Sequence, residues 1–105
     1  MKIYIAGRIS KDPEYKIKFD HAEWILRDRG YDVVNPANNA PPKGTEWTYR
    51  KYIDAGLKQL MTCDVIFLLP GWQSSDGALL EHSYAKITGM GIWHQDSWEG
   101  WRVER

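Results

Sequence analysis

The sequence predicts an α/β fold, with a sheet of about four parallel strands and helices on both of its faces. Short apolar runs bounded by Gly, Asp or Pro alternate with longer segments in which apolar residues recur every three or four positions. Single helical segments separate successive apolar runs, which is the order of repeated βαβ units. Because crossovers between parallel strands are right-handed, such units build a three-layer sandwich with the sheet in the middle.

The first half of the chain contains two expected strands and one expected helix. Residues 3–6 are an apolar run ended by a glycine, which favours a central strand. Residues 14–29 have apolar side chains at helical spacing, and Gly30 follows them as a C-cap. Residues 31–34 form a short second strand, which an Asn-Pro pair terminates.

The second half repeats this alternation. Thr45 can cap a second helix, because apolar residues recur at helical spacing beyond it. Residues 65–69 are a continuous apolar run between Asp and Pro, as in a buried third strand. A third helix is expected over residues 76–88, and residues 90–93 form a weak fourth strand.

Composition restricts the classes of function. The 105 residues suit one domain spanning residues 1–105, with a Trp-rich C-terminal tail at residues 94–105. Basic and acidic residues number 14 each, so the net charge of zero gives no electrostatic footprint for a nucleic acid polymer. No apolar run approaches the roughly 20 residues of a membrane span.

The single cysteine, Cys63, cannot form an internal disulfide. We therefore expect a cytoplasmic protein without a membrane partner.

Three unusual loops follow expected strands. They begin after Ala6, Val34 and Leu69, and each leaves the carboxyl end of its strand. Ligands of parallel α/β sheets bind beyond these ends. The three loops are therefore expected to meet at one cleft.

Glu81 is the main candidate for chemistry in that cleft. It lies in the third expected helix, among small residues that leave space for a ligand. A carboxylate there can act as a nucleophile or as a general acid or base. Ser74 or Ser75 caps the helix, and with Gly77 it forms a helix start where an anion can bind. The alternatives are a solvated glutamate and ordinary capping.

Other side chains are weaker candidates. Arg8 lies in a Gly7-Arg8-Ile9-Ser10 turn that could hold a second anion. Tyr4 lies on a buried strand, either as core or as a ligand contact, because its phenol needs a partner. Trp72 could stack on a base or another ring. The histidines are scattered and show no metal-ligand spacing, so we expect no metal and no organic cofactor.

The tryptophans concentrate at the end of the chain. Of six, Trp93, Trp98 and Trp101 lie in the last 13 residues. They either pack over a small core or form a contact between subunits, since exposed aromatic clusters mark interfaces. Zero net charge offers no barrier to pairing, so we expect a homodimer or a larger homo-oligomer.

Several motifs resemble the small DUF4406 proteins, which are common in phages and prophages. Those proteins are similar to nucleoside 2-deoxyribosyltransferases and to deoxynucleoside 5′-monophosphate N-glycosidases. The resemblance extends to about Ile92. Its motifs are Tyr4-Ile5-Ala6-Gly7, Val33-Val34-Asn35-Pro36-Ala37, Cys63-Asp64, and Leu69-Pro70-Gly71-Trp72 with Ser75, Gly77-Ala78 and Glu81.

The resemblance implies a flavodoxin-like (Rossmann-like) fold and a glutamate that attacks C1′ of the sugar, a role that falls on Glu81. The residue six positions earlier contacts the sugar 5′ end, and a serine there, Ser75, is typical of the monophosphate hydrolases. The first loop helps to hold the phosphate. The expected substrate-binding residues are Tyr4, Gly7, Arg8, Ser10, Asn35, Gly71, Trp72, Ser75 and Gly77.

One position departs from the family pattern. Members place an acid in the second helix, eight residues before the Asp that opens the third strand, and here that position is Gly56. The nearest acid, Asp54, is displaced by two positions, or about 200° of helix turn. Asp54 is therefore the second catalytic candidate. Whether its carboxylate reaches the cleft determines how the leaving base can be protonated.

Together these observations lead to one main hypothesis. The protein cleaves or transfers the N-glycosidic bond of a (deoxy)nucleoside 5′-monophosphate, with Glu81 as the nucleophile. Its partner is then a small nucleotide or nucleoside. Two alternatives stay open. One is a non-catalytic nucleotide-binding protein of phage or prophage origin that uses the same cleft. The other is an interaction protein whose Trp-rich tail binds a partner.

Overall fold

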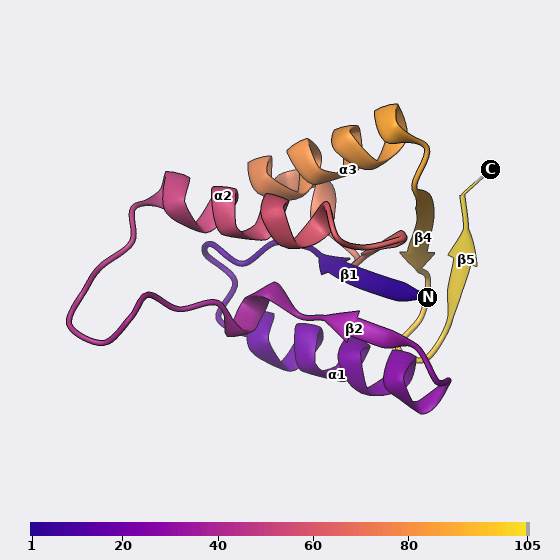
Figure 1. Ribbon diagram of the computed structural model, residues 1–105. Helices are drawn as coiled ribbons and strands as arrows, with labels where there is room; N and C mark the ends of the chain where they lie inside the picture. The colour runs from indigo at the N-terminus through magenta and orange to yellow at the C-terminus, as the bar shows by residue number, and fades with distance from the viewer. Residues whose placement is uncertain (105) are drawn as a thin grey trace.

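A five-stranded sheet forms the middle layer of the protein in the computed structural model, which describes residues 1–104 (Figure 1). The strand order is β2-β1-β3-β4-β5. The strands are β1 (Lys2–Ala6), β2 (Asp32–Val34), β3 (Val65–Leu68), β4 (Gly91–Gln95) and β5 (Trp101–Val103).

The first four strands are parallel, as the sequence predicts. β1 pairs with β2 on one side and with β3 on the other, and β4 continues the sheet beyond β3. β5 pairs antiparallel with β4, with Gln95 opposite Trp101. The sequence predicted about four strands and a Trp-rich tail at residues 94–105, and did not predict that part of this tail forms a fifth strand. A short hairpin turns the chain back, so that the tail adds an edge strand.

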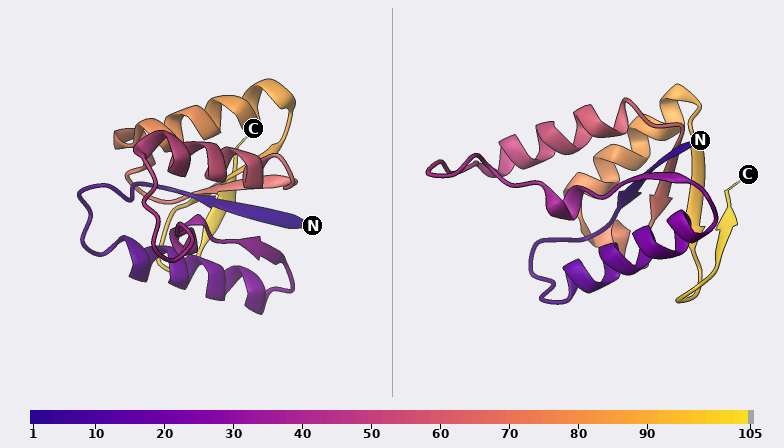
Figure 2. Two further views of the ribbon diagram at one scale, coloured as in Figure 1. Left: turned by 60° about the vertical axis from the view of Figure 1, so that its left-hand side comes forward. Right: turned by 60° about the horizontal axis from the view of Figure 1, so that its bottom comes forward.

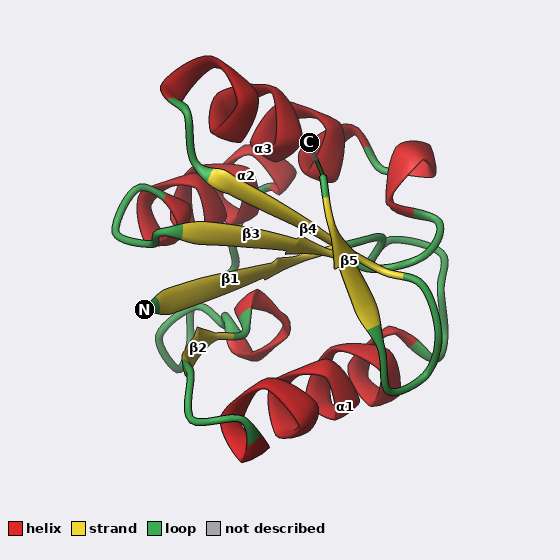
Figure 3. Cartoon of the chain, turned by 90° about the vertical axis from the view of Figure 1, so that its right-hand side faces the viewer, coloured by secondary structure: helices red, strands yellow, loops and turns green. Residues whose placement is uncertain are grey.

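Helices cover both faces of the sheet (Figures 2 and 3). α1 (Tyr15–Asp28) covers one face, and α2 (Tyr49–Leu60) with α3 (Asp76–Thr88) covers the other. Alternate residues of each strand therefore enter different cores. Ile3 and Ile5 pack on the α1 side, whereas Tyr4 and Ala6 pack on the side of α2 and α3. No helix of residues 1–104 is both long enough and apolar enough to cross a membrane.

The two later helices start at side-chain caps. Ser75 Oγ accepts a hydrogen bond from the backbone N–H of Ala78, so one of the two expected serines caps α3. α2 begins at Tyr49, and Thr48 is its cap. The expectation that Thr45 caps this helix was wrong. The Thr45 hydroxyl donates to the Pro42 carbonyl in an earlier turn.

Two of the three C-terminal tryptophans pack within the chain. Trp93 and Trp101 stack with ring centroids 5.7 Å apart. Trp101 makes an edge-to-face contact with Phe67, and the Arg29 guanidinium lies 4.7 Å from the centre of the Trp101 ring. These contacts hold the two tryptophans against the α1-side core. Trp98 is 54% exposed and stacks on His21 at 3.7 Å. Intramolecular packing therefore accounts for Trp93 and Trp101.

We predict that Trp101→Ala destabilises the fold by about 2–3 kcal/mol, because it removes the ring that joins β5 to the core. Trp98→Ala is the matched control. It removes a surface stack and should cost less than about 1 kcal/mol. Urea unfolding followed by circular dichroism measures both. Equal losses would mean that β5 is held by backbone pairing rather than by Trp101.

Candidate functional site

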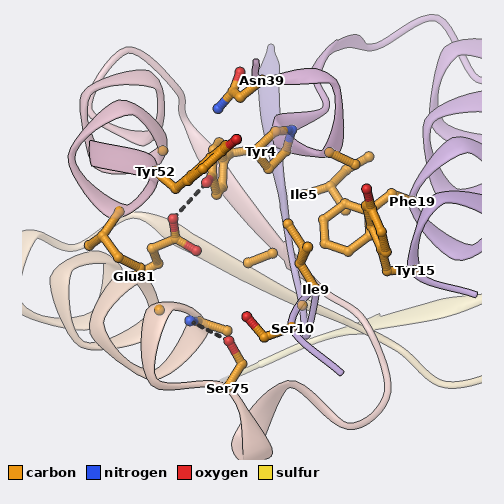
Figure 4. Close-up of a pocket in the computed structure, with 18 of the residues that line it drawn as sticks. Tyr4, Ile5, Ile9, Ser10, Tyr15, Phe19, Asn39, Tyr52, Ser75 and Glu81 are labelled. Carbon is orange, nitrogen blue, oxygen red and sulfur yellow. Dashed lines mark hydrogen bonds between the residues drawn. The ribbon is translucent and has the colours of Figure 1, made fainter. Parts of the chain in front are cut away.

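A cavity of about 340 Å³ lies at the carboxyl ends of the central strands (Figure 4). The end of β1 and the loop after it form its floor. α1 and the short 3₁₀ turn η1 (Pro36–Asn38) form one wall, and α2 with the start of α3 forms the other. Its polar groups are the hydroxyls of Tyr4, Ser10, Tyr15, Tyr49, Tyr52 and Ser75, the amide of Asn39 and the carboxylate of Glu81.

A hydrogen bond between Tyr4 and Glu81 joins the sheet to α3 inside this cavity. The Tyr4 hydroxyl donates to Glu81 Oε2 at 2.6 Å. Glu81 is only 8% exposed and Tyr4 only 1% exposed, so the bond lies away from bulk water. The structure therefore places Glu81 in the cavity and excludes the alternative of a solvated surface residue.

Gly56 on α2 allows this pair to approach the helix. A Cβ atom at Gly56 would lie 2.7 Å from the Tyr4 hydroxyl oxygen and 2.9 Å from Glu81 Oε2. Both distances are shorter than real Cβ contacts. A side chain at position 56 would thus have to displace one or both members of the buried pair. The position where the resemblance places an acid is occupied here by the Tyr4–Glu81 contact itself.

Burial changes the protonation of Glu81. Loss of solvent raises the pKa of this carboxyl to about 7, and the hydrogen bond from Tyr4 opposes that rise. The pKa of Tyr4 is raised well above its ordinary value, first by burial and then by the nearby Glu81 charge. The phenol therefore stays protonated and acts as a donor while Glu81 exchanges its proton near neutral pH.

A second hollow, of about 260 Å³, shares Ser10, Tyr49 and Ser75 with the cavity. It adds two cationic side chains, Arg8 and Lys11. The Arg8 guanidinium donates to the Ser10 carbonyl at 3.0 Å and to Ser74 Oγ at 3.3 Å, so the loop after β1 is tied to the start of α3. Of the hollow's lining residues within 1–104, Asp76 is the one acid. The hollow thus combines two cations with the amino-terminal end of a helix, an arrangement that suits an anion.

The structure brings together most of the expected site residues. Glu81, Tyr4, Gly7, Ser10, Ser75 and Gly77 all line the cavity, and Arg8 lines the adjoining hollow. They come from β1, the loop after it and the start of α3, which the parallel topology places side by side.

Four expected residues lie elsewhere. Asn35 is buried, but its amide bonds to Asp20 and Glu23 and its oxygen caps η1. Gly71 has a φ of 85° and opens the short 3₁₀ turn η2 (Trp72–Ser74). The Trp72 ring packs against His82, with centroids 4.5 Å apart. Neither Gly71 nor Trp72 lines the cavity.

Asp54 also lies outside the cavity. Its side chain is 55% exposed and pairs with Arg50 at 3.8 Å. The regular turn of α2 directs positions 53 and 56 to the cavity and position 54 away from it. The Asp54 carboxylate therefore does not reach the cavity, as expected for an acid displaced by two positions in a regular helix.

Sequence reasoning missed the aromatic walls. Tyr15 on α1 and Tyr49 and Tyr52 on α2 line the cavity, as does Asn39 beyond η1. Apolar residues at helical spacing predicted the helices that contain Tyr15 and Tyr49, but not that either side chain lines a cavity. A stripe that faces a cavity has the same period as one that faces a core. Asn39 exchanges two hydrogen bonds with Gln59, a pairing that no local pattern signals.

Comparison with known proteins concerns the family and the fold. The family model for a domain of unknown function, DUF4406, matches residues 1–94. The chain belongs to the DUF4406 family. The comparison with curated proteins found no match. Within residues 1–104, no group of three His, Cys, Asp or Glu side chains could hold a metal ion.

Solved structures share the fold of this DUF4406 protein. A 2-deoxyribosyltransferase from Bacillus psychrosaccharolyticus has a TM-score of 0.72 at 24% identity, over 90% of this chain and 71% of that one. A conserved protein from Enterococcus faecalis V583 has a TM-score of 0.69 at 22% identity, over 92% and 65%. The CMP N-glycosidase of Clostridium botulinum has a TM-score of 0.54 at 22% identity, over 88% and 66%. The predicted similarity to both enzyme classes is confirmed at the level of fold.

We predict that Glu81→Gln stabilises the protein at pH 8 but not at pH 4. The pKa of Glu81 is about 7 when folded and near 4.5 when unfolded, so the unfolded state loses its proton first as the pH rises. Wild-type stability is therefore complete below about pH 4.5 and falls by the order of 3 kcal/mol through pH 7. The Gln variant keeps an acceptor for Tyr4 and has no such loss.

Urea unfolding of both proteins at pH 4, 6 and 8 measures this difference. Glu46→Gln, at an exposed position, is the control and should change stability by less than about 0.5 kcal/mol throughout. A gap between Glu81→Gln and wild type that does not vary with pH would contradict the raised pKa.

Proposed function

We propose that this protein cleaves or transfers the N-glycosidic bond of a nucleoside 5′-monophosphate, with Glu81 as the nucleophile. The observation that carries the proposal is the buried Glu81 carboxylate in a cavity that adjoins a cationic hollow. In this arrangement the sugar lies over Glu81. The 5′-phosphate lies toward Arg8 and Lys11, and the base lies between the helical walls.

The chemistry follows from the bond that breaks. Glu81 attacks C1′ on one face of the sugar while the base leaves from the other, through an oxocarbenium-like transition state. The Tyr4 hydroxyl holds one carboxylate oxygen, which orients the other toward the sugar. Water then releases the sugar phosphate, or a second base accepts the sugar and gives transfer.

The structural neighbours support this class of reaction. The names of two of them denote a 2-deoxyribosyl transfer and the cleavage of an N-glycosidic bond in CMP. This chain spans about two thirds of the length of those proteins, so the activity of each belongs to a longer chain. The proposal for this chain therefore depends on its own cavity.

A second candidate function is binding of a nucleotide without turnover. One observation favours it: Asp54, the acid nearest the position expected for a proton donor, is paired with Arg50 outside the cavity. A neutral base that leaves unprotonated is a poor leaving group. The same cavity could then retain the nucleotide intact.

We predict that Glu81→Gln abolishes base release, because an amide cannot form the covalent intermediate. Asp54→Asn is the matched control. It removes a carboxylate on the exposed side of α2 and should leave the rate within about twofold. Chromatography of free base after incubation with nucleoside monophosphates measures both. Wild-type turnover by Glu81→Gln would rule out the nucleophile, and lost turnover by Asp54→Asn would return the acid role to Asp54.

We predict a preference for the 5′-monophosphate over the free nucleoside of about ten- to a hundredfold in kcat/KM, because charge-assisted contacts to phosphate contribute about 1.5–3 kcal/mol. Ser75→Asp tests its origin. Aspartate can still cap α3, but it adds a negative charge beside the hollow.

The Ser75→Asp variant should reduce the preference for the monophosphate at least tenfold while nucleoside turnover persists. Ser75→Asn caps equally well without the charge, and it should retain most of the preference. Equal kcat/KM for nucleoside and nucleotide in the wild-type protein would show that the hollow holds no phosphate.

We also propose that the protein forms a homodimer. Trp93 and Trp101 no longer support this, because they pack within the chain. Exposed Trp24 and Trp98 remain on the α1 side, both stacked with His21. Light scattering at micromolar concentration should give twice the chain mass. A monomer mass would contradict the proposal, and a dimer that survives Trp98→Ala would move the contact elsewhere.

A further inference from the structure

We propose that the leaving group taken by this cavity is a cationic heterocycle, so that the substrate is a nucleotide whose N-linked ring carries a fixed positive charge, as in a pyridinium or an N-alkylated purinium. This inference rests on the proposed function and names its substrate class. Three features of the cavity support it: its uncompensated negative charge, its aromatic walls and the lack of room for an acidic side chain at position 56.

The first feature is an uncompensated buried carboxylate. Glu81 is 8% exposed, and its partner in the cavity is the neutral Tyr4 hydroxyl at 2.6 Å. Among the described residues that line this cavity there is no Lys, Arg or His. A buried carboxylate without a counter-charge is costly, and burial raises the pKa of Glu81 to about 7. A cation placed in the cavity would provide the missing charge.

The second feature is the aromatic lining. Tyr52 lies on the side of the cavity that carries Glu81, and Tyr15 with Phe19 lies on the opposite side (Figure 4). The Trp47 ring packs edge-on against Tyr52, with centroids 5.2 Å apart, and supports it from the loop before α2. Faces of aromatic rings attract cations, and the Tyr52 side chain, which is 43% exposed, is accessible to a ligand that enters the cavity. Aromatic rings and one carboxylate are the groups that recognise organic cations.

The third feature concerns the leaving group. At position 56 the Tyr4–Glu81 pair leaves no room even for a Cβ, and Asp54 points away from the cavity. Glu81 is thus the one carboxyl group that lines the cavity among residues 1–104. It cannot be both the nucleophile on one face of the sugar and the acid on the other. A neutral base would need a proton from such an acid, whereas a cationic ring needs none.

The reaction balances without a further reactant except water. The C1′–N bond breaks with its electron pair going to the ring nitrogen, so the ring leaves as a neutral molecule. A Glu81 carboxylate oxygen bonds to C1′, and water later replaces it there. That step regenerates Glu81 and releases one proton to the solvent.

The charge distribution of the whole site is consistent with such a substrate. Arg8 and Lys11 line the adjoining hollow and not the cavity that contains Glu81. The site therefore has a cationic end for a phosphate and an anionic, aromatic end for a ring. A nucleotide with a cationic ring has the opposite charge at each end.

The test uses nicotinamide mononucleotide, which has a pyridinium ring, and its neutral dihydro form, which is nearly the same size. Calorimetry at pH 8 measures the binding of both to the full-length protein, and chromatography measures release of the ring. We expect the wild-type protein to bind the cationic form at least tenfold more tightly and to cleave it. Glu81→Gln should bind the two forms within about threefold of each other.

A pair of wall variants tests the aromatic contribution. Tyr52→Phe keeps the ring and should keep the preference for the cation, whereas Tyr52→Leu should reduce it about threefold or more. Equal binding of the two forms by the wild-type protein would overturn the inference. So would a preference that Glu81→Gln retains.

The two proposals fail in different ways. Cleavage of neutral deoxynucleoside monophosphates at rates equal to or above that of the cationic nucleotide would overturn the inference and leave the proposed glycosidase function intact. Preferential binding of the cationic form without cleavage of any nucleotide would support the cation site and contradict the glycosidase.

Discussion

The buried hydrogen bond between Tyr4 and Glu81 is the contact on which the site depends. It joins the central strand β1 to α3, and Gly56 lets α2 close over it. Three segments far apart in the sequence therefore meet at one carboxylate. Because a Cβ on α2 would displace the pair, the same close packing that buries Glu81 also excludes a second functional group from that position. The burial of Glu81 and the absence of a second acid from the described cavity residues therefore have one structural cause.

This constraint divides the site into two ends of different character. Among the described residues, the cavity end has aromatic side chains and one carboxylate, whose pKa is about 7 because of burial. The open end contains Arg8 and Lys11 beside the start of α3. Parallel topology produces both, since the loop after β1 and the start of α3 leave neighbouring strands at the same edge of the sheet. A ligand with one anionic end and one cationic or aromatic end fits this division.

Local sequence patterns predicted the elements whose formation depends on nearby residues, such as strands, helices and their caps. The four parallel strands, a serine cap at the start of α3, and the place of Glu81 at the cleft follow from apolar periodicity, cap residues and strand order. The patterns failed where distant contacts decide. β5 pairs with β4 and Trp101 packs on Phe67, and Tyr52 lines the cavity with Trp47 packed against it; local patterns signal none of these contacts. Asn35 and Trp72 lie near the site in sequence, but their partners are structural residues.

A crystal structure of Glu81→Gln with a nucleoside 5′-monophosphate tests the account most directly, because this variant should hold the substrate without converting it. The side-chain oxygen at position 81 should lie about 3–3.5 Å from C1′, on the face opposite the base. The phosphate should contact Arg8 or Lys11, and the base should lie between Tyr15 and Tyr52. A nucleotide bound with its sugar away from residue 81, or outside this cavity, would mean that Glu81 is not the nucleophile.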